Sequence, residues 1–377
     1  MIVKKILHYS FHFFLPVVLA IPFIANSSDY RVLEIHGRVI KDGALLGKDV
    51  EYIGDGGYLR TFRDSSIVFK KGSFFYKVYP YTKVLIKEES VKLEYGKISR
   101  SKSGNFEEIH FLIFPKPAQG RATKIFLSTE NNHGTWEAMV HGKGYKSRIE
   151  LYRDGDNLYS GYFAFDVKAR PDKYWLSVMF EKDDVVSNFI FPFYLRTLKP
   201  ERGVVYLQEE DLEILKPSRE KKVQIQELRD ILSRSRDEKM WTERFIFPVN
   251  EVKVISKFGK KRIYLLNKKY MFTRFHRGVD LKAKRGQEVM APNTGIVVMA
   301  KRRITTGNTV VIDHGRGVYS LLFHLDSITV KEGDRVDRAT VVGTAGDSGF
   351  AGGVHVHWSV VVNGIYVDPE DWIKIKY

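Results

Sequence analysis

The segments His276-Arg-Gly-Val-Asp280 and Gly353-Val-His-Val-His-Trp358 decide the architecture of the C-terminal part of this 377-residue chain. In the second segment histidine alternates with valine, as in a β-strand, so its two histidines share one face and the valines the other. The first segment separates its histidine from its aspartate by glycine and valine, which favours an extended or turning backbone. One carboxylate and several imidazoles can therefore converge on one face of a sheet.

This set of side chains suits a metal ion. Two histidines and one aspartate are typical of Zn²⁺ with a water in the fourth position, and zinc lowers the pKa of that water from about 15.7 to about 7. A further histidine in Phe323-His-Leu-Asp326 leaves imidazoles to accept a proton or to stabilise an oxyanion. The chain has no cysteine, which excludes thiolate ligands and cysteine nucleophiles, and it lacks the helical His-Glu-x-x-His signature.

From about residue 247 to 373 the chain resembles a lysostaphin-type (LytM-like) zinc peptidoglycan endopeptidase domain. The matching pieces occur in order along the chain: Ile255–Gly259, His276–Asp280, Gly286–Pro292, Gly307–Gly315, His324–Asp326, Gly343–Gly346, Gly353–Trp358 and Val367–Pro369. The resemblance implies an antiparallel β-sheet domain. It covers about a third of the chain, and Arg277 and Val356 are its small departures.

The resemblance also implies the roles of single residues. His276, Asp280 and His357 would hold one Zn²⁺ per chain, and His324 and His355 would form the catalytic pair. The implied activity is hydrolysis of peptide cross-links of peptidoglycan by a zinc-activated water, with peptidoglycan stem peptides as the substrate. Some relatives lack ligands and only activate other wall hydrolases. A catalytically silent wall-binding protein or activator is therefore the alternative, although the ligand set is intact here.

The N-terminus indicates the compartment. Met1–Lys5 is basic, Ile6–Ala25 carries no charged residue, and small and polar residues follow. This pattern predicts a signal peptide over residues 1–27. An uncleaved membrane tether through residues 6–25 is the alternative, because about 20 apolar residues can span a bilayer. Either segment predicts an exported protein in the periplasm or cell envelope.

Composition predicts a mostly β, multi-domain protein, since Val, Ile, Tyr and Phe recur in short runs between Gly, Asn and Asp. With 61 basic and 45 acidic residues the net charge is +16, which suits an anionic partner such as the wall or simply solvated lysine-rich faces. Nucleic acid is not expected as a partner, because the export signal argues against it.

We predict five regions along the chain. After residues 1–27 come a small β-domain at 28–103, an immunoglobulin-like β-sandwich at 104–200, a helical linker at 201–240 and the zinc endopeptidase domain at 241–377. The segment Val91–Gly96 and the strand rhythm around it weakly resemble a FecR-type domain. The linker carries an apolar helical stripe, composed of Val223, Ile225, Leu228, Ile231 and Leu232.

The upstream domains have three possible roles: to position the enzyme, to bind envelope proteins or to cover the groove. Covering predicts that residues 241–377 alone cleave faster than the longer chain.

Four other features have simpler interpretations. Gly346-Asp-Ser-Gly349 spells the tetrad around a serine-protease nucleophile, but without a matching histidine segment it predicts a glycine-rich turn. His314 is expected to be a structural hydrogen-bonding residue. Asp326 is expected to orient His324 or a neighbouring backbone group. Asp154 is expected to be a solvated loop residue.

Overall fold

The structure is a computed structural model that describes residues 30–375, apart from 51, 55, 88–89, 107–108 and 130–133. The predicted signal peptide or tether therefore lies outside the described residues. Within the described part, no helix is long and apolar enough to cross a membrane. The chain forms two compact units. The first comprises the described residues within 1–108, 129–148 and 174–193, and the second those within 109–128, 149–173 and 194–377.

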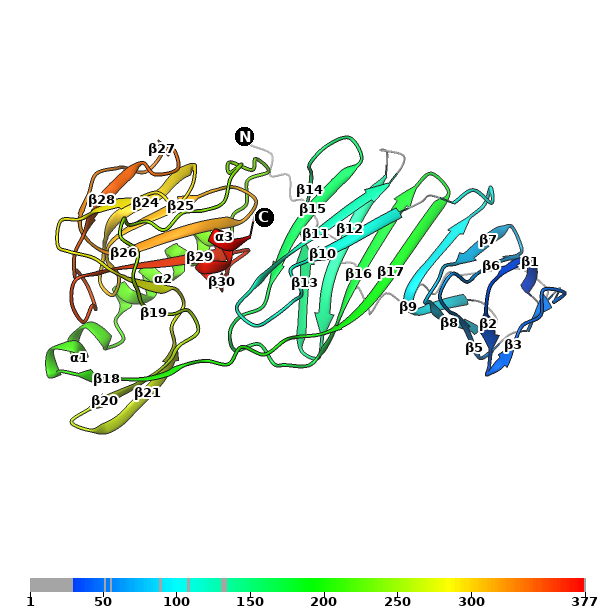
Figure 1. The fold of residues 1–377 in the computed structure, drawn as a ribbon, viewed down its shortest axis with the longest axis horizontal. Helices are drawn as coiled ribbons and strands as arrows, with labels where there is room; N and C mark the ends of the chain where they lie inside the picture. Colours follow the sequence, from blue (N-terminus) through cyan, green and yellow to red (C-terminus); the bar gives the residue numbers. More distant parts are fainter. Residues whose placement is uncertain are drawn as a thin grey trace, which may run out of the picture. The chain divides into compact units, whose positions relative to one another are not determined.

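The first unit is built on a sheet that has 13 strands in the described part of the chain (Figure 1). In chain order these are β1 Tyr30–His36, β2 Val39–Lys41, β3 Ala44–Leu45, β4 Tyr52–Ile53, β5 Tyr58–Thr61, β6 Ser66–Lys71, β7 Phe74–Val78, β8 Lys83–Lys87, β9 Ser90–Ser101, β12 Thr135–Gly142, β13 Tyr145–Ile149, β16 Lys173–Lys182 and β17 Val185–Tyr194. Alternation fixes which face is inside: in β6 the side chains Ile67 and Phe69 are buried and their neighbours are half-buried. The predicted strand content is confirmed.

The two predicted upstream β-domains share this sheet. Strand β9, from the region 28–103, pairs antiparallel with β17, from the region 104–200. Other strands of the region 104–200 form a four-stranded sheet of the second unit, in the order β10 (Ile109–Phe114), β11 (Ala122–Thr129), β15 (Leu158–Ala164) and β14 (Leu151–Arg153). The FecR-like and immunoglobulin-like assignments stay predictions.

The second unit also contains a ten-stranded sheet, again counted over the described residues. Its strands are β19 Val254–Ser256, β22 Val279–Lys282, β23 Glu288–Met290, β24 Gly295–Arg303, β25 Gly307–Asp313, β26 Val318–Ile328, β27 Arg335–Val336, β28 Val341–Ala345, β29 His355–Val362 and β30 Ile365–Val367. All its pairings are antiparallel, as predicted, and helix α3 (Pro369–Lys374) follows.

Strand β29 is the centre of this sheet, between β22 and β26. Val356, Trp358, Val360 and Val362 alternate along β29 and are fully buried in one core cluster, so a one-residue slip would move this apolar set to the other face. The predicted turn Asn363-Gly364 joins β29 to β30, and both residues have the positive φ that such a turn requires. Register is thus fixed by burial and by the turn together.

A three-stranded sheet completes the second unit. Strand β18 (Arg202–Leu207) runs parallel to β20 (Lys261–Leu266), which forms an antiparallel hairpin with β21 (Lys269–Phe275). The predicted linker therefore begins with a strand. Two helices follow it, α1 (Glu209–Leu215) and α2 (Arg219–Leu232), and the Ser218 hydroxyl caps the second by accepting from the amide of Lys221.

Helix α2 is packed on the ten-stranded sheet. Leu232 is buried with Tyr319 and Leu321 in one apolar cluster, and Leu228 and Ile231 pack against it. The predicted stripe is wrong at its other end, since Val223 and Ile225 are 60% and 49% exposed. In place of apolar contacts, this first half of the helix uses Gln224, whose main-chain oxygen accepts from Arg303 and whose side chain accepts from the amide of Ile304.

Candidate metal centre and active site

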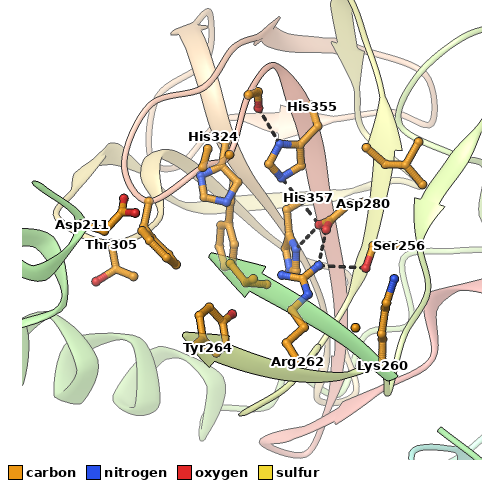
Figure 2. A pocket seen from close by; sticks show the side chains of 18 of the residues that line it. Asp211, Ser256, Lys260, Arg262, Tyr264, Asp280, Thr305, His324, His355 and His357 are labelled. Atoms are coloured by element: carbon orange, nitrogen blue, oxygen red, sulfur yellow. Dashed lines mark hydrogen bonds and ion pairs between the residues drawn. The ribbon is translucent and has the colours of Figure 1, made fainter. Parts of the chain in front are cut away.

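Register places the site on three adjacent strands. Asp280 of β22 lies opposite His357 of β29, and His357 lies opposite Phe323 of β26. His276 directly follows β21, at the start of the connection to β22, and reaches Asp280 and His357, which Figure 2 labels. As predicted, His355 and His357 lie on one face of β29, with Val356 fully buried between them.

Three ligand-type atoms form a small triangle at this point. His276 Nε2 lies 3.0 Å from Asp280 Oδ1 and 3.0 Å from His357 Nδ1, and His357 Nδ1 lies 2.9 Å from Asp280 Oδ1. Among the described residues these three side chains form a group able to hold a metal ion.

Hydrogen bonds on the far side of each ring fix which nitrogen carries the proton. His276 Nδ1 lies 2.9 Å from the carbonyl oxygen of Lys257, which can only accept. His357 Nε2 lies 2.8 Å from Ser359 Oγ, whose own proton goes to the carbonyl of Arg277 at 2.8 Å. In the neutral rings His276 Nε2 and His357 Nδ1 therefore present lone pairs.

The donor set fits a small cation. Two nitrogen lone pairs and a carboxylate oxygen about 3 Å apart repel one another unless a positive charge lies between them. Zinc binds imidazole nitrogen at about 2.0–2.1 Å and carboxylate oxygen at about 2.0–2.2 Å, which suits a triangle of this size. Outer hydrogen bonds that fix the tautomer are also typical of metal-binding histidines.

A glycine allows this close packing. A Cβ at Gly278 would lie 2.5 Å from His357 Nε2 and 2.5 Å from the carbonyl oxygen of Trp358. Any side chain here would displace His357 from its bond to Ser359.

His324 and His355 lie beside the triangle, with ring centroids 4.9 Å apart (Figure 2). His324 Nδ1 donates to the carbonyl of Ser348 at 2.8 Å, and His355 Nδ1 donates to the carbonyl of Gly353 at 2.8 Å. Each neutral ring therefore keeps a lone pair on Nε2, and His355 Nε2 lies 3.6 Å from Asp280 Oδ1.

The backbone of His324 is unusual as well. Its φ is +64°, a left-handed conformation that costs energy for a residue with a Cβ, and its amide donates to the carbonyl of Thr306 at 3.0 Å.

Burial sets the charges of the site. It lowers the pKa of His324 to about 3 and that of His357 to about 4. For Asp280 burial raises the pKa of the carboxyl group, but the adjoining His276 and His357 rings outweigh it and hold that pKa below its ordinary value. The site therefore combines neutral imidazoles with an ionised carboxylate, which is the protonation state that metal ligands need.

Asp280, His324, His355 and His357 line a pocket of about 570 Å³, and His276 contacts two of them, Asp280 and His357. One wall comes from β18, the start of α1 and the residues around β20; residues 305–306 and 350–354 also line the pocket. The first wall includes Gly203–Tyr206 and Asp211, which precede the predicted domain boundary at residue 241. Segments outside the predicted endopeptidase domain thus help to form the pocket.

One expectation about a single residue is wrong. The carboxylate of Asp326 does not orient His324; it pairs with Arg285 at 2.8 Å. Asp154 is the exposed loop residue that was predicted, and its carboxylate also accepts from Arg316 and lies 3.7 Å from the ammonium group of Lys124.

His314 is the structural hydrogen-bonding residue that was predicted. It is fully buried, with Nδ1 2.8 Å from the carbonyl of Thr294 and Nε2 2.9 Å from Ser320 Oγ. Gly346–Gly349 is a turn and not a nucleophile: the Ser348 hydroxyl donates to the carbonyl of Leu325 at 2.6 Å.

Sequence reasoning missed several residues of the site. Ser348 was dismissed with the serine-protease tetrad, yet its carbonyl orients His324. Ser359 could have been found, because it lies two residues after His357 on the same strand face. Arg262, which donates to Asp280 Oδ2 and to Ser256 Oγ, carries no sequence signal that links it to the site.

Comparisons with known proteins match the part of the chain that carries this site. Residues 274–369 match the family model of Peptidase family M23. The chain is 32% identical over 119 residues to peptidoglycan DD-endopeptidase ShyA of Vibrio cholerae. This match covers 31% of this chain and 27% of ShyA. It is 32% identical over 124 residues to DD-carboxypeptidase/endopeptidase Mpg of Neisseria meningitidis, which covers 33% of this chain and 28% of Mpg.

Among solved structures, the chain is similar to the catalytic domain of lysostaphin from Staphylococcus simulans. The identity is 27% and the TM-score 0.29, over 33% of this chain and 95% of that chain.

The C-terminal part of this chain therefore carries an M23 peptidase domain. The matched segments span less than a third of the length of the two curated relatives named above. The similarity to these two relatives is thus a property of the domain.

Proposed function

We propose that this chain is an exported zinc metalloendopeptidase that hydrolyses peptide cross-links of peptidoglycan. The observation that carries the proposal is the triangle of proton-free donor atoms from His276, Asp280 and His357, beside two more imidazole lone pairs in an open pocket. The named activity of ShyA, a peptidoglycan DD-endopeptidase, points to peptidoglycan as the source of the substrate.

The three donor residues would hold the zinc ion. When bound, zinc would polarise a water molecule and the carbonyl of the bond to be cut. Ser359 and the carbonyl of Lys257 keep His357 and His276 in the tautomers that such a ligand role needs.

His324 and His355 would move the proton. Each presents Nε2 to the pocket, so either ring can accept the proton that water loses as its oxygen attacks the carbonyl carbon. The protonated ring then stabilises the negative oxygen and returns a proton to the amine as the carbon–nitrogen bond breaks. The products are a carboxylate and a free amine. Burial lowers the pKa of His324 to about 3, so its ring is neutral and its Nε2 lone pair is unprotonated at neutral pH.

The remaining proposals concern location and partners. Residues 1–27 would direct export to the periplasm or envelope, either cleaved or retained as a tether through residues 6–25. The net charge of +16 would attract the chain to a carboxylate-rich wall. The upstream strands would position the domain or bind other envelope proteins.

The test uses a chain that starts at Ser28, incubated with purified peptidoglycan with and without a zinc chelator. His324→Ala is the matched variant, because it removes a proton acceptor and leaves the three donor residues intact. We expect new peptide ends that depend on both zinc and His324. A chain that retains zinc but releases no fragments would favour the wall-binding or activator alternative.

A further inference from the structure

One wall of the pocket is basic, and the proposed function does not use it. Lys260, Arg262 and Tyr264 all line the pocket, and the spacing of two residues places them on one face of the extended segment that includes β20 (Figure 2). These residues lie before the M23 match at 274–369. Two cations therefore stand at neighbouring positions on the same side of the pocket.

Lys260 is held in place by its surroundings. Its side chain crosses Gly203 of β18, where a Cβ would lie 2.6 Å from Lys260 Cε. Its main-chain oxygen accepts from the amide of His276 at 2.9 Å, which ties its position to the proposed metal ligand. The residue is half-buried, and no carboxylate in the described part of the chain forms an ion pair with it.

Arg262 stands between Lys260 and the floor of the pocket. Its Nη2 donates to both Asp280 Oδ2 and Ser256 Oγ. Its Nε and Nη1 donors have no partner among the described residues and remain available to a ligand. A divalent cation on Asp280 Oδ1 would share that carboxylate with Arg262, so the positive charges here would outnumber the negative ones.

Besides Asp280, the pocket is lined by one other acidic side chain, Asp211. It is engaged at the start of α1, where Oδ2 accepts from the amide of Gln208 at 2.8 Å. Its carboxylate is therefore used in capping the helix, and it forms no ion pair with Lys260 or Arg262.

We infer that Lys260 and Arg262 form a subsite for a carboxylate of the substrate, on a residue that flanks the bond to be cut. This inference rests on the proposed function and adds the substrate chemistry that the pocket selects. An ammonium and a guanidinium together bind a carboxylate more strongly than neutral donors do, and more so when half-buried. A peptide whose flanking carboxylate is converted to a carboxamide would lose this interaction.

The experiment measures binding with the zinc-loaded His324→Ala chain, so that the substrate is not consumed. The probes are two pairs of synthetic cross-linked stem peptides, with the carboxylate on either side of the bond, each paired with its carboxamide. By isothermal titration we expect at least one carboxylate peptide to bind about tenfold more tightly than its carboxamide, since one charge-assisted contact is worth that much.

Lys260→Met is the test variant, because it keeps the stem over Gly203 and removes the charge. This variant is expected to reduce the preference for the carboxylate peptide over its carboxamide to less than about threefold. Lys260→Arg is expected to restore that preference. Lys269→Met, an exposed lysine of the same hairpin that does not line the pocket, is the control and should change nothing. In the active chain, Lys260→Met should raise KM for the acidic peptide about tenfold with kcat nearly unchanged.

Each outcome decides the proposal. An equal affinity for carboxylate and carboxamide in both pairs, or an equal loss for both after Lys260→Met, would overturn the subsite. Zinc-dependent cleavage without any preference would leave the proposed function standing and remove the subsite. A preference that depends on Lys260, in a chain that cleaves nothing, would support the subsite and sink the proposed endopeptidase activity.

Discussion

The floor of the pocket and its β18–β20–β21 wall differ in how their residues are fixed. The floor lies on β22, β29 and β26, where Val279, Leu281, Val356 and Trp358 are fully buried. The wall is a small sheet with large apolar side chains in water: Tyr206 is 67% exposed and Tyr270 is 65% exposed. Core packing fixes the residues of the floor. The wall is instead fixed by the parallel pairing of β20 with β18, which comes from earlier in the chain.

We expect the floor to carry the chemical step and the wall to set the preference for a substrate. The metal-type residues need positions fixed to a fraction of an ångström, and a packed sheet core provides that. A wall that is mostly surface tolerates change, so it is where substrate preference can vary at little cost in stability. The predictions below test this division.

The largest effect is expected at the floor. Asp280→Asn removes the only carboxylate of the triangle, so zinc binding should fail and peptidoglycan cleavage should fall by more than the roughly hundredfold that loss of an outer partner costs. Zinc content and fragment release measure this. His36→Ala, at an exposed histidine of the first unit, is the control. Normal zinc content in Asp280→Asn would contradict the assignment of the ligand.

The next effect concerns the packing of helix α2 on the sheet that carries the floor. Leu232→Ala in α2 leaves a cavity beside Tyr319 and Leu321, and should lower the free energy of unfolding of the second unit by about 2–5 kcal/mol. Denaturant unfolding of the full chain measures it. Ile225→Ala, exposed on the same helix, should cost far less. Equal effects would mean that Leu232 does not hold α2 against the sheet.

A third effect depends on pH. Burial lowers the pKa of His314 to about 4, below the ordinary value of 6.5, so the unfolded chain takes up a proton more readily than the folded one. His314 therefore stabilises the fold fully above about pH 6.5 and loses that contribution as the pH falls toward 4. The difference between these two pKa values of His314 corresponds to about 3 kcal/mol in the free energy of unfolding.

The measurement is the free energy of unfolding as a function of pH. His314→Gln keeps a hydrogen-bonding side chain without a titrating group, so its profile should be flatter between pH 6.5 and 4. A variant profile with the same slope as the parent would show that other groups carry the acid sensitivity.

The smallest effect is expected from Ser359→Ala. This change removes the acceptor that holds His357 in its tautomer, and should weaken zinc binding about 10- to 100-fold in a chelator competition. Ser327→Ala, at an exposed serine on β26, is the matched control. If both variants bound zinc alike, the tautomer of His357 would have to be fixed by something other than Ser359.

Much of the fold and site follows from sequence. Alternation in Val354–Trp358 places two histidines on one strand face, and the turn Asn363-Gly364 sets a hairpin. Both are local: side-chain period and turn chemistry act between residues close in the chain. The strand content and the M23 resemblance came from the same kind of signal, and the structure brings together all five predicted site residues.

Only the tertiary structure showed the partners of these residues. Three contacts join segments that no sequence periodicity connects. The carbonyls of Ser348 and Lys257 accept from His324 and His276, and Arg262 donates to Asp280. Strand β18 pairs with β20 and forms a wall of the pocket. The pairing of Asp326 with Arg285, and the exposure of Val223 and Ile225, were likewise invisible. Local patterns specify which residues can bind a metal, whereas long-range packing decides what surrounds them, because backbone carbonyls and parallel edge pairing leave no mark on residue type.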